Sequence, residues 1–458
     1  MLSSKSIYLS TNQPVFLVVD IVLFLIALGL LVPIAVLFIE CSAALSPART
    51  ESWAASVPRP RVAVLVPAHN EASGIGATLE TILPQLTAQD RLVVIADNCS
   101  DDTAAVAKRC CESVALASLQ SSAQIAKCYS ESEVALLANS GIAQEPALSE
   151  RSFGVIVVER QEPERSGKGY ALDYGLRSIE EDPPDVVVMI DADCSVHQGT
   201  IERIAGLAAS VARPIQATYL MEQPANPGPK DSISALAFMV KNLVRPSGLA
   251  QLRLPCLLTG TGMAFPWSAI KNVMVASGNI VEDMQLAIDL AIAGQAPVFC
   301  QEAKVIGRLP QQQQAAKKQR KRWEHGHLQT LLTQVPKLLK AAVLKRRFDL
   351  LALALELCVP PLSLLVMIWV VVMGSSLLAG ALGASWIPAI FSAAEGLLIF
   401  ISIVSAWAKF GRDDFPVLTL LSVPFYILWK IPLYLAFLIR PQKKWIRTER
   451  DAAESSKS

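Results

Sequence analysis

The chain has 458 residues, 52% of them hydrophobic and 18% charged, which is an apolar excess over ordinary soluble proteins and ample length for a large core. Its formal net charge of +1 at pH 7 produces no global field that would point to a nucleic-acid partner. The nine cysteines lack CxxC spacing, which favours reduced thiols on a cytoplasmic face over a disulfide framework.

Apolar residues gather at both ends of the chain. Residues 21–39 carry no charge, are long enough to cross a bilayer and lack a small-residue cleavage site, so we expect residues 1–40 to form a transmembrane anchor. Residues 349–440 form a second apolar region, followed by a polar tail at 441–458. Three runs in that region predict three further spans: 361–382, 386–408 and 416–438.

The charges flanking these spans give conflicting signals about topology. A cytoplasmic middle domain at 41–348 places the N-terminus outside, which suits its single Lys5. Three later crossings would place the tail outside, although its basic residues favour the cytoplasm. Those residues are Lys443, Lys444, Arg447 and Arg450. An extra crossing or a re-entrant turn at 350–361 would resolve the conflict. We expect a multi-pass protein of the cell (inner, cytoplasmic) membrane.

The middle domain alternates strand-like and helix-like segments. β-branched runs at 61–66, 92–96, 155–158 and 186–190 each precede a helix-compatible stretch, which predicts an α/β domain with a mainly parallel sheet. Polar clusters follow three of these runs, and ligands of such sheets bind beyond the carboxyl ends of the strands. An Ala/Ser-rich insertion is expected at 109–151, and interfacial helices at 311–348.

The pair Asp191 and Asp193 follows the last of these strands. Residues i and i+2 of an extended chain face the same side, so both carboxylates can approach one hard cation, Mg²⁺ or Mn²⁺. A solvated turn is the alternative for an isolated Asp-x-Asp. Asp97 ends the second strand, where we expect a nucleotide contact, while Asp101 or Asp102 caps the next helix.

Three further motifs carry charge at predicted helices. Glu282 and Asp283 begin a helix, where they complement its dipole or serve as a general base. Lys168 stands between two glycines, as a cation near phosphate or as a solvated side chain in a flexible turn. The basic run 317–322 suits an interfacial helix. Gln319, Arg322 and Trp323 share one face of that helix, where arginine can stabilise a departing diphosphate and indole can stack on a sugar.

These residues resemble the membrane-embedded family 2 glycosyltransferases, which include cellulose, hyaluronan and poly-N-acetylglucosamine synthases. Residues 67–71 resemble the family's opening nucleotide loop, and Asp191-Ala192-Asp193 its metal-binding pair. Residues 260–263 resemble the loop beneath the acceptor, and 281–283 the Thr-Glu-Asp motif, with valine in place of threonine. Residues 319–323 match the Gln-x-x-Arg-Trp signature of processive members. The resemblance implies a GT-A-like domain flanked by transmembrane helices.

The resemblance also implies a role for each matching residue. Asp283 is then the catalytic base, Arg322 helps the diphosphate leave, and Asp191 and Asp193 hold the metal. The implied nucleotide-sugar contacts are Pro67, His69, Glu71, Asp97, Lys168 and Asp191. The implied acceptor contacts are Gly260, Thr261, Gly262, Glu282, Gln319 and Trp323.

The expected activity is inverting transfer from a UDP-sugar to a growing polysaccharide or glycan, with Mg²⁺ or Mn²⁺, at the cytoplasmic membrane face. A second possibility is transfer of a single sugar to a lipid or polyprenyl carrier through the same site. The spans are fewer than in synthases that thread a polymer outward, so export would call for partner subunits. A transporter or a non-catalytic membrane scaffold is the alternative from another class, but few ionisable residues lie in the spans.

Overall fold

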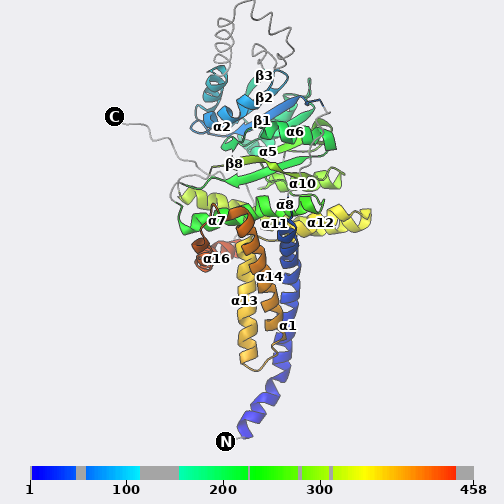
Figure 1. The fold of residues 1–458 in the computed structure, drawn as a ribbon, viewed down its shortest axis with the longest axis vertical. Helices are drawn as coiled ribbons and strands as arrows, with labels where there is room; N and C mark the ends of the chain where they lie inside the picture. Colours follow the sequence, from blue (N-terminus) through cyan, green and yellow to red (C-terminus); the bar gives the residue numbers. More distant parts are fainter. Residues whose placement is uncertain are drawn as a thin grey trace, which may run out of the picture.

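The structure is a computed structural model that describes residues 3–47, 58–113, 154–224, 227–276, 281–308 and 313–439. Most of the expected insertion at 109–151 and the polar tail at 441–458 lie outside these ranges. Figure 1 shows a domain built around a sheet, from which a bundle of long helices projects.

One eight-stranded sheet, in the order β3-β2-β1-β4-β7-β6-β8-β5, forms the centre of the domain. Its strands are β1 Val62–Ala68, β2 Arg91–Asp97, β3 Gly154–Arg160, β4 Val186–Met189, β5 Cys194–Val196, β6 Ile215–Met221, β7 Met263–Pro266 and β8 Val298–Gly307. The four predicted strands are β1 to β4, which pair in parallel as expected. The motif search missed the other half, where β7 runs antiparallel to β4 and β6, and β5 antiparallel to β8.

Helices cover both faces of the sheet, which explains why its central strands are apolar throughout. On β1, Val62, Val64 and Val66 pack into one core, and Ala63 and Leu65 into the other. The first core includes α2 Ile75–Ile82 and α6 Thr200–Val211; the second includes α5 Lys168–Arg177, α10 Glu282–Ile292, and parts of α11 Gln313–Lys345 and α12 Phe348–Cys358. A strand buried on both sides cannot alternate polar with apolar residues.

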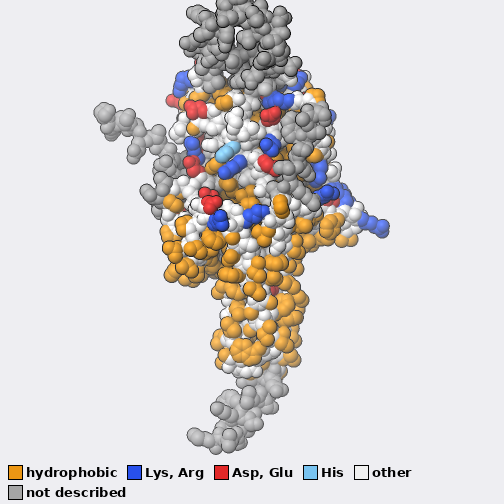
Figure 2. Space-filling model, viewed as in Figure 1, with side chains coloured by type: hydrophobic (Ala, Val, Ile, Leu, Met, Phe, Trp, Pro, Cys, Tyr) orange, Lys and Arg blue, Asp and Glu red, His pale blue; other side chains and the backbone are white. Residues whose placement is uncertain are grey.

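The apolar ends of the chain meet in one bundle. Helix α1 Ser3–Ala43 contacts α13 Leu362–Ala381 and α14 Ile387–Ala406, and Figure 1 shows the three lying side by side. The bundle's surface is largely hydrophobic, while the charged side chains lie over the sheet domain (Figure 2). Within the described residues, three helical stretches are long and apolar enough to cross a membrane: Pro14–Ala43, Leu362–Ala381 and Ile387–Gly411.

Residues 416–438 do not form one helix long enough to cross a membrane, so the span predicted there is wrong. The chain there breaks into α15 Val417–Leu421 and α16 Val423–Ile439, and the apolar stretch Val423–Ala436 is shorter than a span. Helix α16 contacts α13 of the bundle and α7 Pro229–Met239, and Figure 1 shows it below α7, beside the upper end of the bundle. Two crossings by α13 and α14 would return the chain to the side of the sheet domain.

Residues 350–361 also differ from expectation. They form most of α12, whose eleven residues are too short to cross a bilayer, and Pro360-Pro361 then leads into α13. Helix α12 contacts α11, α10 and α1. It lies across the direction of the bundle in Figure 1, so it provides no extra crossing.

A buried ion pair joins α1 to the sheet domain. Arg245, the first residue of α8 Arg245–Gln251, donates from Nε to Glu40 of α1 at 2.5 Å and from Nη2 to the Glu356 carbonyl at 2.8 Å. Beside it, a Cβ on Gly248 would stand 1.9 Å from the carbonyl oxygen of Glu40. Helices α1 and α8 can therefore approach this closely only because Gly248 has no side chain.

We expect Glu40→Ala to lower the free energy of unfolding by about 3–5 kcal/mol, because it leaves the buried Arg245 charge unpaired. The measurement is the midpoint of thermal unfolding in detergent. Asp173→Ala breaks the exposed Arg177–Asp173 pair and is the matched control, expected to leave the midpoint nearly unchanged. Equal shifts in the two variants would show that the Glu40–Arg245 pair does not secure α1.

Candidate active site

A cavity of about 360 Å³ lies between the carboxyl ends of the strands and the helix bundle. Its lining includes residues at the ends of β1 and β2 and the segment 191–193 that follows β4. It also includes Leu37 of α1, Leu362 and Ser363 of α13 and Tyr426 of α16. All but two of the predicted site residues line it. Those present are Pro67, His69, Glu71, Asp97, Lys168, Asp191, Asp193, Gly260, Glu282, Asp283, Gln319, Arg322 and Trp323.

The loops after β1 and β2 hold each other in place. The side chain of Asn70 donates to Ser100 Oγ at 3.0 Å and accepts from the Ser100 backbone N–H at 2.7 Å. His69 Nδ1 lies 2.5 Å from the carbonyl oxygen of Asp97. Asp101 accepts from the backbone N–H of Thr103, as expected of a helix cap. The opening loop and the Asp97 cluster therefore form one rigid rim of the cavity.

Asp97 is buried and paired with a residue that the motif search missed. Arg160 Nη1 donates to Asp97 Oδ1 at 2.5 Å, and both side chains are almost fully buried. The two residues are directly paired in the parallel register of β2 and β3. The sequence does show that β2 ends in Asp97 and β3 in Arg160. Their pairing could be predicted only once β2 and β3 were known to be neighbours in the sheet.

Asp191 and Asp193 form the one cluster of possible metal ligands found among the described residues, together with Cys194. Their ligand atoms lie within 4.8 Å of one another. Burial raises the pKa of the Cys194 thiol well above its usual value, which keeps it protonated and disfavours it as a ligand. The two carboxylates remain, and they fit a hard divalent cation such as Mg²⁺ or Mn²⁺.

Lys168 connects the metal-type carboxylates to the Glu282–Asp283 pair. Its ammonium forms an ion pair with Asp191 and donates to the carbonyl oxygen of Gly260 at 2.6 Å. Gly260 has a φ of +94°, and a Cβ there would lie 3.3 Å from both Lys168 Nζ and Asp283 Oδ2. Glycine is therefore required for both its conformation and this close approach.

The charged groups at this junction shift one another's pKa values. Burial raises the pKa of Glu282 to about 7, with a further contribution from the Asp283 carboxylate. Burial also raises the pKa of Asp283, although Lys168 opposes the shift. Burial alone would lower the pKa of Lys168, but Asp191 and Glu282 raise it above its usual value. Two half-buried carboxylates with raised pKa values beside a fixed cation are typical of an acid–base site.

Thr261 and Gly262, which the resemblance placed among the acceptor contacts, do not line the cavity. Thr261 is fully buried, and its Oγ1 accepts from the Asp191 backbone N–H at 3.1 Å. Gly262 has a φ of +65°, and a Cβ there would lie 2.9 Å from Val305 Cγ2. They position Asp191 and the Gly260 turn, and so act on the site indirectly.

Helix α11 supplies one wall of the cavity. Gln319, Arg322 and Trp323 line it as their shared face predicted, and Arg320 lines it too. Arg320 forms an ion pair with Asp231 at 3.3 Å. The ring of Trp323 lies 6.0 Å from that of Phe238, which lies 5.2 Å from Tyr219. These three rings form an aromatic wall.

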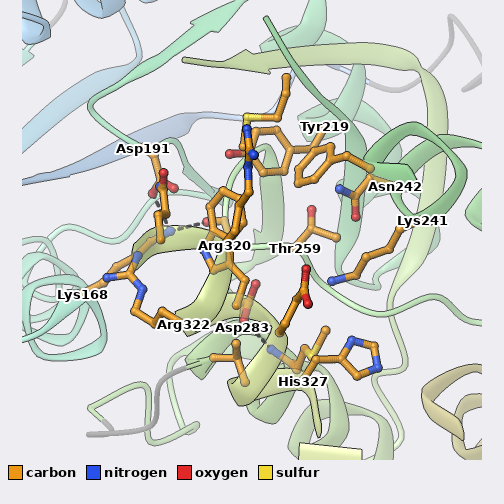
Figure 3. Close-up of a pocket in the computed structure, with 18 of the residues that line it drawn as sticks. Lys168, Asp191, Tyr219, Lys241, Asn242, Thr259, Asp283, Arg320, Arg322 and His327 are labelled. Atoms are coloured by element: carbon orange, nitrogen blue, oxygen red, sulfur yellow. Dashed lines mark hydrogen bonds and ion pairs between the residues drawn. The ribbon is translucent and has the colours of Figure 1, made fainter. Parts of the chain in front are cut away.

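Four polar lining residues have no sequence motif that would have revealed them. Lys241 and Asn242 belong to a π-helical turn, η4 Val240–Val244, which continues α7. Thr259 precedes Gly260, and His327 lies one turn after Trp323 on α11. Figure 3 shows them across Asp283 from Lys168 and Asp191. The π-turn is the structural signal, since such turns occur often at functional sites.

Two family models match the sequence. One, described as "Glycosyltransferase like family 2", matches residues 111–326, and one described as "Glycosyl transferase family 2" matches residues 63–118. No curated protein matches the chain.

Solved structures similar to the chain include two glycosyltransferases. The mannosyltransferase PcManGT from Pyrobaculum calidifontis, in complex with GDP-Man and Mn²⁺, is 18% identical and has a TM-score of 0.50. The similarity covers 89% of this chain and 99% of that one, and it shows a GT-A-like glycosyltransferase fold. Glucosyl-3-phosphoglycerate synthase from Mycobacterium tuberculosis is 18% identical over 61% of this chain and 85% of that one, with a TM-score of 0.34.

We expect Asp193→Asn to weaken Mn²⁺ binding at least about tenfold. Loss of a residue that only hydrogen-bonds to a metal ligand already lowers metal affinity by about that factor, and Asp193 is a candidate ligand itself. The measurement is titration calorimetry of Mn²⁺ into the full chain in detergent. Asp173→Asn, a change on α5 outside the cavity, is the matched control. Unchanged affinity in Asp193→Asn would remove this carboxylate from the metal site.

Proposed function

The chain belongs to glycosyltransferase family 2, and from that premise we propose that it transfers a sugar from a nucleoside diphosphate donor to a glycan or lipid-linked acceptor. The observation that carries this proposal is the junction at Gly260. There Lys168 pairs with Asp191 and lies beside Asp283, within one cavity. A carboxylate suited to a metal (Asp191), a cation suited to a diphosphate (Lys168) and a candidate base (Asp283) thus lie side by side.

The strand-end part of the cavity suits the donor. Asp97, with the rim formed by residues 67–71, is placed for the base and ribose, and Asp191 and Asp193 for a metal-bound diphosphate. A bound Mg²⁺ or Mn²⁺ would offset the diphosphate charge. Arg322 lines the same cavity and is a second cation for the leaving group. We propose a UDP-sugar as the donor, and the GDP-Man complex of PcManGT makes GDP-mannose the first alternative.

Asp283 is the proposed base. Burial raises its pKa, which makes its carboxylate a better proton acceptor for an acceptor hydroxyl. The hydroxyl oxygen would attack the anomeric carbon as the bond to the diphosphate oxygen breaks, and its proton would pass to Asp283. A single displacement of this kind inverts the anomeric carbon. Glu282 neighbours the base and completes the acidic pair.

The other end of the cavity points to a membrane setting. Leu37, Leu362 and Ser363 belong to helices that are long and apolar enough to cross a bilayer, and all three line the cavity. We propose that the sheet domain faces the cytoplasm at the cell membrane. Polysaccharide extension and single transfer to a lipid carrier would both use this cavity, and product length distinguishes them. Partner subunits would be required for export.

We expect Asp283→Asn to lower the rate of sugar transfer at least about 100-fold, since it removes the general base. The measurement is release of nucleoside diphosphate by the full chain in detergent with Mn²⁺, across UDP-sugars and GDP-mannose, with membrane lipid and glycan acceptors added. Asp289→Asn, an exposed change on the same helix, is the matched control and should retain activity.

The two variants also separate the rival interpretations. Transfer that survives Asp283→Asn would show that another residue is the base. Absence of release with every donor and acceptor combination would favour a non-catalytic scaffold. Release that needs no acceptor would be donor hydrolysis alone.

A further inference from the structure

The cavity contains buried polar atoms that have no partner within the described ranges. They include the hydrogen-bond acceptors Asn242 Oδ1, His327 Nε2, Gln319 Oε1 and Glu324 Oε2. The hydroxyl of Thr259 is also unpaired. A buried acceptor without a donor is costly, so this set is suited to a ligand that brings several O–H groups.

His327 is neutral, which makes its Nε2 an acceptor. Burial lowers the pKa of His327 well below its usual value, and Lys241 and Arg245 lower it further. The carbonyls of Leu357 and Val359 favour a proton on the imidazole ring. His327 lines the cavity, and its Nε2 has no hydrogen-bond partner within the described ranges. With the other ring nitrogen donating, this Nε2 is an acceptor.

Lys241 differs from the other cations that line the cavity. Lys168 is paired with Asp191, Arg245 with Glu40 and Arg320 with Asp231. Arg322 also has an interaction partner. Across the described part of the chain, no hydrogen bond or ion pair holds the Lys241 ammonium. Figure 3 shows its side chain extended into the cavity.

The position of Lys241 argues against a role for it on the donor diphosphate. In Figure 3, Lys241, Asn242 and His327 lie on one side of Asp283, while Lys168 and Asp191 lie on the other. A diphosphate held near Asp191 would therefore be separated from Lys241 by the proposed base. Lys241 lines the same cavity, on the side of Asp283 away from Lys168 and Asp191.

We propose that Lys241, Asn242, Thr259 and His327 form an acceptor subsite for a sugar that carries an anionic group, either a carboxylate on its ring or a phosphate ester. The hydroxyls of the sugar satisfy the orphaned acceptors, and its anion pairs with the Lys241 ammonium. The aromatic wall of Tyr219, Phe238 and Trp323 offers a flat face for the ring. This inference rests on the proposed function, because it names the acceptor class of the same site.

The test is titration calorimetry of three probes into the full chain, after its donor site is saturated with Mn²⁺ and with whichever of UDP or GDP it binds. The probes are glucose, glucuronic acid and glucose 1-phosphate, which share a ring and differ in charge. We expect the better anionic probe to bind at least about tenfold more tightly than glucose, as a charge-assisted contact would provide. Preference for glucose 1-phosphate indicates a phosphate-linked acceptor, and preference for glucuronic acid an acidic glycan.

Variants then assign the preference to Lys241. Lys241→Met keeps the length of the side chain and removes its charge, and should reduce the preference to within about twofold. Lys241→Arg should retain it, as should Lys271→Met, an exposed lysine away from the cavity. Binding of the nucleoside diphosphate reports that each variant is folded.

The outcomes separate this proposal from the one on which it rests. Equal binding of glucose and the anionic probes to the unmodified chain would overturn the subsite, even if Lys241→Met did not fold. A preference that survives Lys241→Met would overturn it as well. Failure to bind either nucleoside diphosphate would instead overturn the proposed function itself.

Discussion

The contacts of the Lys168 ammonium hold the candidate site together. This one group pairs with Asp191 after β4 and donates to the Gly260 carbonyl, next to Asp283 at the start of α10. Three acidic side chains in one half-buried space need a cation among them, since desolvation and mutual repulsion would otherwise favour their protonated forms. The glycine at 260 allows lysine and aspartate to approach from opposite sides. A candidate metal ligand and the proposed base therefore meet at this junction.

The second constraint is the attachment of α1 to the sheet domain. Arg245 pairs with Glu40 of that helix and also lines the cavity, so the anchor and the site share a residue. The π-turn that precedes Arg245 carries Lys241 and Asn242. A tilt of α1 against α8 would therefore displace the π-turn and its Lys241 and Asn242 in the proposed acceptor subsite. This arrangement explains why an apolar helix far away in sequence contributes Leu37 to the lining.

The sequence motifs identified many residues that line the cavity but gave no signal for several others. Asp191, Asp193, Glu282 and Asp283 stand at the ends of strands and the start of a helix, where local pattern and chemistry coincide. Lys241 and His327 carry no such pattern. They become neighbours only because a π-turn and α11 face the same cavity. The family resemblance grouped Thr261 with Gly260 as an acceptor contact, whereas Gly260 lines the cavity and Thr261 is fully buried behind it.

The sequence alone determined the parallel half of the sheet, the order of its motifs and the presence of long apolar helices, because hydrophobic periodicity and strand-end chemistry are local. Tertiary structure decided the antiparallel half, where β7 is inserted between β4 and β6, since pairing partners distant in sequence leave no local mark. It also decided that residues 416–438 break into two short helices and that α12 lies against α11. Hydropathy measures the apolar content of a segment. Whether that segment covers a protein surface or faces lipid depends on what it packs against.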